Sequence, residues 1–341
     1  TGRKYQRSSR LQSLVEDATA SLLPGRIGKS TSQDVRQERI PVELICPILG
    51  RATVVRPTSF SSGPWEIVKC TETGFVFLAN PPSYDQLQVE HAWEVTSLAE
   101  KNRRRREEPL VSGVSLMAAR LKQTLFPRRN RFFTLSLELA ERTGKSRPIR
   151  VLDIGCGAGN LLEEMQQRFS EIGHSIVPQG IEVSAHLAAI ADQRCARLGG
   201  RVASANAVDG SAQFEPASTD LIIMSSFLEH ECQPLVLLNR LHSVLTDDGV
   251  IVLKVPNFSS LNRVLRSTKW CGFRFPDHVN YFTPETLRRL AEESGFRISR
   301  QGLLDCLPFS DTMYAVLAKD NRAASVRQKS FDLAENQSHA A

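Results

Sequence analysis

The sequence predicts an α/β fold, in which a mostly parallel sheet carries helices on both faces and follows a small β-rich region. From residue 150 onward, strand-like segments alternate with helical ones, a pattern typical of βαβ units. This half opens with a strand that runs into a glycine-rich loop, residues 151–160. At 341 residues, the chain is long enough for one large domain and a smaller one.

The elements of this half follow from apolar runs between turn signals. Ser184 is suited to cap a helix N-terminus, Pro234 is tolerated in a first helical turn, and Gly295 is suited to end a helix. Strands are predicted at 150–154, 176–182, near 202, 220–224, 249–255, 296–303 and 312–317, and helices at 161–169, 185–198, 234–245 and 284–294.

The region before this half contains short strand-like pieces, such as 65–68 and 74–78. Two segments, 46–50 and 70–74, are similar to the knuckles of a zinc ribbon, but Leu49 and Thr73 stand where each knuckle would have its second cysteine. Structural zinc needs four ligands, and His91 is a weak candidate for a third. We therefore expect a ribbon without metal, held by apolar packing of Leu49, Phe75 and Phe77.

The domain boundaries follow from these patterns. We predict a mobile basic arm (1–37), a degenerate zinc-ribbon-like region (38–93), a helical linker or cap (94–145), the α/β domain (146–319) and a mobile tail (320–341).

Charge and cysteine usage limit the possible partners and compartment. The net charge is +6, and residues 101–150 alone hold a balance of +10. Such a segment can attract nucleic acid, an anionic membrane or an acidic substrate. A solvated helix is favoured, because no aromatic residue is interleaved with Arg103–Arg106. No apolar run is long enough to cross a bilayer, the first residues do not form a secretory signal, and seven scattered cysteines favour a reducing, cytoplasmic location.

The glycine loop points to the ligand. Its pattern is Asp153-x-Gly155-x-Gly157-x-Gly159. A dinucleotide fingerprint would need glycine where Asn160 stands. The pattern instead resembles motif I of the class I S-adenosylmethionine-dependent methyltransferases.

Further segments strengthen this resemblance. The fourth strand of the family is similar to residues 220–224, and its Leu-Glu-His signature is similar to the Phe-Leu-Glu-His sequence at 227–230. The turn that leads into the fifth strand of the family is similar to residues 245–249. Residues 278–287 and 294–296 match a subgroup related to the ubiquinone-pathway O-methyltransferases. The resemblance implies a Rossmann-like seven-stranded sheet with an antiparallel last strand, and S-adenosyl-L-methionine as cofactor.

The resemblance also implies a cofactor site at the carboxyl ends of the strands. Asp153 would reach the cofactor ammonium, and Glu182 would accept hydrogen bonds from the ribose hydroxyls. Asn206 or Asp209 would take the adenine amino group, with Val208 packing on the ring. The expected cofactor-binding residues are Asp153, Gly155, Cys156, Gly157, Gly159, Glu182, Val183, Asn206, Asp209 and Ser225, and no metal ligand is expected.

Methyl transfer depends mainly on alignment, but a hydroxyl acceptor also needs a base. His278 is the first candidate for this base and His230 the second, while Glu229 would orient the site. The segment around His278 is rich in aromatic residues, which would form either the wall of an apolar substrate pocket or a packed cap: Trp270, Phe273, Phe275, Tyr281 and Phe282.

Three functions are compatible with these residues. The first is O-methylation of a small metabolite or of a lipid- or sugar-linked intermediate. The second is methylation of nucleic acid, RNA in particular, through the basic segment 101–150, although the sheet lacks the Asn-Pro-Pro-Tyr type of motif used on bases. The third is a non-catalytic module that binds S-adenosylmethionine. The acceptor and the oligomeric state are left open.

Overall fold

The computed structural model describes residues 42–82, 130–144 and 146–320. Every helix and strand below belongs to the second of the two units into which the chain divides, Pro41–Ala341. The predicted arm 1–37, most of the predicted linker 94–145 and nearly all of the predicted tail 320–341 lie outside the described residues.

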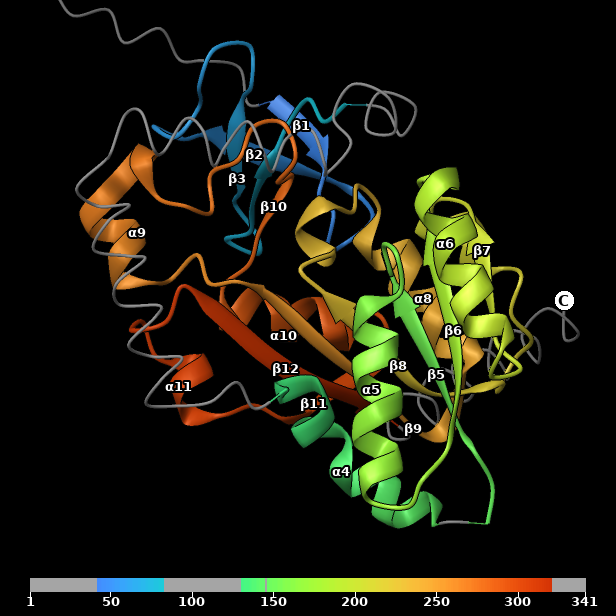
Figure 1. Ribbon diagram of the computed structural model, residues 1–341. Helices are drawn as coiled ribbons and strands as arrows, with labels where there is room; N and C mark the ends of the chain where they lie inside the picture. The colour runs from blue at the N-terminus through green and yellow to red at the C-terminus, as the bar shows by residue number, and fades with distance from the viewer. Residues whose placement is uncertain (1–41, 83–129, 145, 321–341) are drawn as a thin grey trace, which may run out of the picture. The chain divides into compact units, whose positions relative to one another are not determined.

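A seven-stranded sheet forms the centre of the α/β half, in the order β11-β12-β9-β8-β5-β6-β7 (Figure 1). Strand β12 runs antiparallel to both of its neighbours, and the other neighbouring pairs are parallel. The predicted mostly parallel sheet with an antiparallel last strand is therefore confirmed. The strands are β5 (Ile149–Ile154), β6 (Ile176–Glu182), β7 (Arg201–Ser204), β8 (Thr219–Ser225), β9 (Leu245–Pro256), β11 (Phe296–Arg300) and β12 (Thr312–Lys319).

Helices cover both faces of this sheet, because its strands are apolar on both sides. Val151 and Ile223 belong to the core cluster on one face, whereas their neighbours Leu152 and Ile222 belong to the cluster on the other. Helices α4 (Arg131–Thr143), α5 (Asn160–Glu171) and α6 (Ala185–Ala196) pack on the first face, and α7 (Ala207–Ser211), α8 (Pro234–Val244) and α10 (Pro284–Glu293) on the second (Figure 1).

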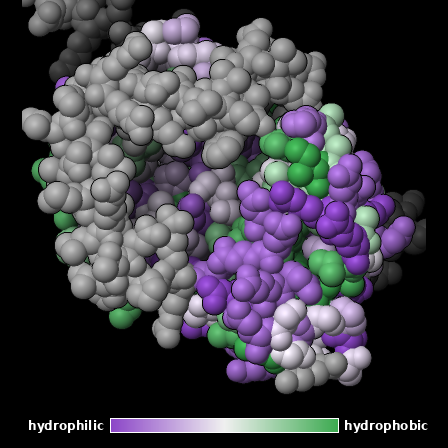
Figure 2. All heavy atoms as spheres, in the orientation of Figure 1, coloured by the Kyte–Doolittle hydropathy of each residue, from purple (hydrophilic) through white to green (hydrophobic). Residues whose placement is uncertain are grey.

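Helix α5 shows why these segments are amphipathic. Leu162, Met165 and Phe169 are buried against the sheet, while Glu163 and Glu164 are exposed. Figure 2 shows hydrophilic side chains gathered over the outer side of this helix. The spacing of the buried residues places them on one helical stripe.

The predicted helix boundaries depend on local capping, and the structure confirms them to within a few residues. Ser184 Oγ accepts a hydrogen bond from the backbone N–H of Leu187 at 3.4 Å, which caps α6. Thr283 and Thr286 form a reciprocal capping box at the start of α10. Gly295 follows the end of α10 with a φ of 80°, a left-handed conformation that suits glycine.

A second, five-stranded antiparallel sheet has the order β1-β2-β3-β4-β10, and its first four strands precede the α/β half along the chain. Strand β10 comes from the segment after β9 and not from the N-terminal region. It pairs Asn280 with Phe77 and Tyr281 with Val76. The strands are β1 (Val42–Ile45), β2 (Ala52–Pro57), β3 (Ile67–Cys70), β4 (Val76–Leu78) and β10 (Asn280–Tyr281).

The two ribbon-like segments, 46–50 and 70–74, form tight turns of this sheet. Gly50 and Gly74 each donate a backbone hydrogen bond to the carbonyl of the cysteine four residues earlier, and both have positive φ. Thr73 Oγ1 lies 3.7 Å from Cys46 Sγ, while Thr53 Oγ1 lies 3.4 Å from Cys70 Sγ. Phe75 and Phe77 are buried and Leu49 packs against the same core, as expected if packing replaces metal ligation.

The aromatic residues after β9 form a packed cap, which was one of the two alternatives. Trp270 and Phe273 are buried with ring centroids 5.5 Å apart, and Phe273 lies 5.1 Å from Tyr281. They share one apolar cluster with Ile67 and Leu78 of the N-terminal sheet. This segment also contains α9 (Leu261–Arg266) and the 3-10 turn η2 (Ser267–Lys269), and α11 (Leu303–Cys306) precedes β12.

No helix within the described ranges is both long and apolar enough to cross a membrane.

Candidate active site

The glycine loop lies between the end of β5 and the start of α5. Gly155, Gly157 and Gly159 have φ values of 71°, 55° and 83°, which an L-residue adopts only with strain. A Cβ at Gly155 would lie 2.6 Å from Cδ2 of Phe227, so the aromatic ring packs directly on the loop. A Cβ at Gly157 would meet no atom within 4 Å. The loop is thus supported at Gly155 and open at Gly157.

Glu182 ties this loop to the end of β6. Its Oε2 accepts a hydrogen bond from Gly157 N at 2.8 Å, and its Oε1 accepts one from Ser184 N at 2.9 Å. A carboxylate has about four acceptor positions, so these two bonds leave capacity for two hydroxyl donors. The structure therefore brings Glu182 and the glycine loop together as the sequence predicts.

Asp153 lies beneath the loop in β5, where it is 2% exposed. Its Oδ1 has no hydrogen-bond partner in the described part of the chain. Burial, together with the nearby negative charge of Glu182, raises the pKa of Asp153 to about 8. A buried carboxyl without a partner is suited to receive a cationic ligand group, because the cation would offset the cost of ionisation.

Cys156 has a packing role within the same loop. A Cβ added at Gly180 would lie 2.6 Å from the Sγ of Cys156. The Cys156 thiol therefore fills the space beside Gly180 that a larger residue there would occupy. Burial raises the pKa of Cys156 far above its ordinary value. A thiol that stays protonated is unreactive. Cys156 is therefore interpreted as a small residue that fills a tight space and not as a reactive thiol.

The remaining predicted cofactor residues follow neighbouring strands. Val183 directly follows β6, and Ser225 ends β8. Asn206 caps α7, its Oδ1 accepting from Asp209 N at 2.9 Å and its Nδ2 donating to Asp209 Oδ2 at 2.7 Å. The two predicted adenine partners therefore bond to each other, and the buried Val208 lies between them in sequence.

Glu229, His230 and His278 form a compact cluster next to β8. The first two lie in the 3-10 turn η1 (Leu228–His230), and His278 comes from the segment before β10. One ligand-capable atom of each residue lies within 4.8 Å of the others, and the imidazole centroids are 4.7 Å apart. The structure thus joins the three predicted catalytic residues from two distant segments.

Burial sets the ionisation of this cluster. It raises the pKa of Glu229 to about 8, and together with the positive charge of Arg274 it lowers the pKa of His230 to about 4. The ring nitrogen Nδ1 of His230 lies 2.8 Å from the carbonyl oxygen of Asp277. The ring nitrogen Nδ1 of His278 lies 2.8 Å from the carbonyl oxygen of Gly272. Since a carbonyl oxygen only accepts, Nδ1 carries the hydrogen in both rings.

Two residues that support the site were not predicted. Phe227 packs on Gly155, and the buried Asn280 donates from Nδ2 to the carbonyl oxygens of Leu228 and Glu231 at 3.1 and 2.6 Å. Asn280 therefore fixes the turn that carries Glu229. Both residues stand within the segments that carry the family resemblance, and this position was the available signal.

Comparison with known proteins gives the family of this site. A family model described as "Methyltransferase domain" matches residues 117–301, more than half of the chain. The chain belongs to this methyltransferase family. The predicted membership of the class I S-adenosylmethionine-dependent methyltransferases is thereby confirmed, and the glycine loop, Glu182 and the Leu-Glu-His turn all lie inside the matched range.

Individual relatives of this methyltransferase are distant. It is 26% identical over 161 residues to the ubiquinone biosynthesis O-methyltransferase of Burkholderia pseudomallei (strain 1710b), covering 44% of this chain and 65% of that protein. It is 31% identical over 170 residues to that of Paraburkholderia xenovorans (strain LB400), covering 46% and 67%. The chain thus spans about two thirds of the length of these relatives. A structure of a SAM dependent methyltransferase from Archaeoglobus fulgidus aligns with 59% of this chain and 98% of its own, at a TM-score of 0.41 and 20% identity.

Proposed function

We propose that this methyltransferase transfers the methyl group of S-adenosylmethionine to an oxygen atom of a small metabolite or of a lipid- or sugar-linked intermediate. The observation that carries the proposal is the pairing of two acidic residues at the glycine loop. Glu182 accepts one backbone hydrogen bond from the loop, at Gly157 N, and one from Ser184 N after its own strand, and Asp153 is buried beside it without a partner among the described residues. Oxygen is favoured as the acceptor atom because the more similar relatives are O-methyltransferases.

In this proposal the residues of the loop recognise the two polar ends of the cofactor. Asp153 pairs with the ammonium, and Glu182 accepts hydrogen bonds from the ribose hydroxyls with its remaining lone pairs. The open side of Gly157 allows a close approach of backbone to ligand. Asn206 or Asp209 would bind the adenine amino group, with Cys156, Val183 and Ser225 completing the contacts.

The same proposal gives the reaction. S-adenosylmethionine, when bound, supplies an electrophilic methyl group. The chain would orient the acceptor oxygen for in-line attack on that methyl group, so that an O–CH₃ bond would form as the S–CH₃ bond breaks. The hydroxyl proton leaves toward the Glu229–His230–His278 cluster, with His278 as the first candidate and His230 as the second. The low pKa of His230 makes it a weak base, which favours His278 for this step.

Methylation of nucleic acid is not favoured by the described residues. Three arginines of the basic segment 101–150 are engaged in ion pairs within the domain. Arg131 bonds to Asp305, while Arg147 and Arg150 bond to Asp220. Their charges are therefore partly neutralised, which weakens the electrostatic attraction that phosphate binding requires. A cytoplasmic location remains a prediction from the cysteine usage.

The test combines binding, transfer and two variants. We expect calorimetry to show binding of S-adenosylmethionine, and labelled cofactor to place its methyl group on one compound of a cell extract. Glu182→Ala should abolish cofactor binding, since it removes a charged acceptor and unties the loop. Glu164→Ala, on the exposed side of α5, is the matched control.

His278→Ala separates binding from chemistry. The variant should bind the cofactor normally and transfer methyl groups far more slowly. Full turnover by His278→Ala would show that this histidine takes no part in the reaction, and failure of the wild-type chain to bind S-adenosylmethionine would overturn the proposed function as a whole.

A further inference from the structure

We propose that Glu229, His230 and His278 bind one divalent transition-metal ion of the zinc type, through two imidazole nitrogens and a carboxylate oxygen. Two histidines and one carboxylate are the three protein ligands of one class of catalytic zinc site, which keeps a further position open for water or substrate. Within the described ranges, this is the one group of three such residues whose ligand-capable atoms converge. These residues belong to the site already described, and the metal ion is a ligand that neither the sequence nor the family model indicates.

The two histidines are oriented as metal ligands usually are. In both rings Nδ1 donates to a backbone carbonyl oxygen at 2.8 Å, that of Asp277 for His230 and that of Gly272 for His278. Such a bond fixes the tautomer and directs Nε2 as the ligating nitrogen. The carbonyls belong to the segment that carries His278 itself, so both rings are held by one piece of backbone.

The carboxylate has the environment that a cation would satisfy. Glu229 is 1% exposed, and its Oε2 has no hydrogen-bond partner in the described part of the chain. The guanidinium of Arg274 is near, but it is bonded to Asp277 at 2.9 Å. A buried carboxyl group is ordinarily paired with a cation or bound to a metal, because isolated burial is costly.

The distances require only a small closure. Ligands of one tetrahedral zinc ion, with bonds of about 2.1 Å, lie roughly 3.4 Å from one another. The candidate atoms lie within 4.8 Å, so the ligand side chains would move by about 1 Å.

A bound ion would change how the acceptor is activated, a consequence that rests on the proposed O-methyl transfer. The acceptor oxygen would occupy the open position and lose its proton more readily, because a metal ion lowers the pKa of a bound hydroxyl. The oxygen would then attack the methyl carbon, the O–CH₃ bond would form as the S–CH₃ bond breaks, and the proton would pass to solvent. Both imidazole Nε2 atoms would hold the ion, so neither histidine would act as the base. The acceptor would then be a compound that can bind a metal through oxygen.

The experiment measures metal binding to the full chain directly. The protein is stripped with a chelator, dialysed against zinc chloride and analysed for metal per chain. We expect one equivalent in the wild type, and affinity reduced by more than about 100-fold in His230→Ala and His278→Ala, because loss even of a ligand's hydrogen-bond partner costs 10–100-fold. Circular dichroism and calorimetry with S-adenosylmethionine verify that these variants fold.

Two controls separate this site from other ligands. His186→Ala removes an exposed histidine of α6 and should leave zinc binding unchanged. A Cys46→Ser and Cys70→Ser double variant should also retain the zinc, which excludes the ribbon-like turns. Cobalt(II) bound in place of zinc should give a visible spectrum without thiolate-to-metal charge transfer, since the ligands are nitrogen and oxygen.

The outcomes distinguish the metal site from the methyltransferase function. The metal site is overturned if the wild type takes up no zinc, or if the zinc is lost from the cysteine variant and retained by the histidine variants. Stripped protein that binds S-adenosylmethionine and methylates at the full rate would overturn the role of the ion while leaving the proposed function intact. Protein that binds zinc at the cluster but does not bind the cofactor would overturn the function and leave the metal site.

Discussion

At the scale of single residues, the two carboxyl groups beside the glycine loop differ in the hydrogen bonds that they accept. Glu182 accepts two backbone N–H bonds, whereas Asp153 is buried without a hydrogen-bond partner for Oδ1 among the described residues and has a pKa raised to about 8. Near neutral pH, Asp153 is therefore mostly protonated before the cofactor binds. Its pairing with an ammonium would require it to lose that proton.

Proton release on cofactor binding is the first prediction. Between pH 6 and 7 the affinity for S-adenosylmethionine should rise by up to about tenfold, since one pKa unit corresponds to a factor of ten. About one proton should leave per cofactor bound, which calorimetry in buffers of different ionisation enthalpy measures. Asp153→Asn should lose this pH dependence, and a wild-type affinity that does not change with pH would contradict the assigned partner.

The same group affects the unliganded protein. The folded pKa of Asp153 lies above the ordinary value of 3.8, so the folded chain holds a proton that the unfolded chain has lost. The contribution of this group to the free energy of unfolding therefore falls as the pH rises from about 4 to about 8. Asp153→Asn should flatten that part of the stability profile.

The second prediction compares two glycines of the loop. Both Gly155→Ala and Gly157→Ala place a side chain at positive φ, at a cost of about 1–2 kcal/mol. Only Gly155→Ala also forces a Cβ against the ring of Phe227. Chemical denaturation should therefore show the larger loss for Gly155→Ala, and Phe227→Ala should relieve part of it in the double variant. If both single variants lost the same free energy of unfolding, the Phe227 ring would move aside at no energetic cost.

The glycine loop also shows how far the sequence leads at this scale. The loop, Asp153 and Glu182 were predictable because strand ends and glycine spacing are local patterns, and the structure places all three together. The contact of Phe227 with Gly155 and the hydrogen bonds of Asn280 to the η1 turn were not, because they depend on tertiary packing. The approach of His278 to Glu229 depends on tertiary packing as well, because 49 residues of sequence separate them.

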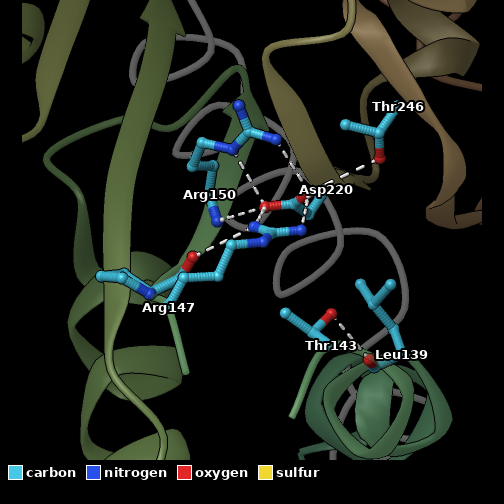
Figure 3. Close-up of polar contacts among 7 residues, drawn as sticks. Leu139, Thr143, Arg147, Arg150, Asp220 and Thr246 are labelled. Carbon is cyan, nitrogen blue, oxygen red and sulfur yellow. Dashed lines mark hydrogen bonds and ion pairs between the residues drawn. The ribbon is translucent and has the colours of Figure 1, made fainter. Parts of the chain in front are cut away.

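At the scale of secondary-structure elements, the amino end of β8 is fixed by an ion-pair network. Asp220 is buried and accepts from Arg147 Nη1 at 2.7 Å and from Arg150 Nε and backbone N at 3.0 Å (Figure 3). Burial alone would raise the pKa of Asp220, but the hydrogen bonds from Arg147 and Arg150 outweigh it and lower the pKa to about 2. The network joins the starts of β5 and β8, at the opposite edge from the glycine loop.

The third prediction follows from this network. Asp220→Ala should lower the free energy of unfolding by about 3 kcal/mol, at the low end for a broken buried pair, since both arginine side chains are partly exposed. The depressed pKa means that this stabilisation is present above pH 4 and is lost as the pH falls toward 2.

Denaturation at pH 7 and at pH 3 measures both effects. Arg288→Ala, which removes exposed ion pairs on α10, is the control and should change the free energy of unfolding by no more than about 0.5 kcal/mol. Cofactor affinity should stay unchanged in Asp220→Ala, and a large loss of affinity would show that the two edges of the sheet are coupled.

Most elements of the α/β half were predictable because each has its own signal, such as the Ser184 cap or the alternation of strands and helices. Strand β10 has none, since two residues, Asn280 and Tyr281, carry no periodicity. It exists because its backbone pairs with β4, so only the folded chain shows that the segment after β9 completes the N-terminal sheet. The 3-10 turn that carries Glu229 and His230 is likewise fixed by Asn280.

At the scale of the folded unit, the two sheets share apolar cores. Phe75 of the N-terminal sheet is fully buried, and its ring lies 5.1 Å from that of Phe282, which immediately follows β10. The same core cluster includes Leu253 of β9 and Leu287 of α10. The N-terminal sheet and the methyltransferase sheet are therefore expected to unfold together and not as separate domains.

The fourth prediction tests this coupling. Phe75→Ala should lower the free energy of unfolding by about 3–5 kcal/mol, the cost of removing a buried aromatic ring. The free energy of opening should fall by the same amount in the N-terminal sheet and in the methyltransferase sheet. Native-state hydrogen exchange measures this, by comparing amides of β3 and β4 with amides of β8 and β9. Phe309→Ala, at a ring that is 75% exposed, should leave both unchanged. If the amides of β3 and β4 lost protection while those of β8 and β9 kept theirs, the shared core would not couple the two sheets.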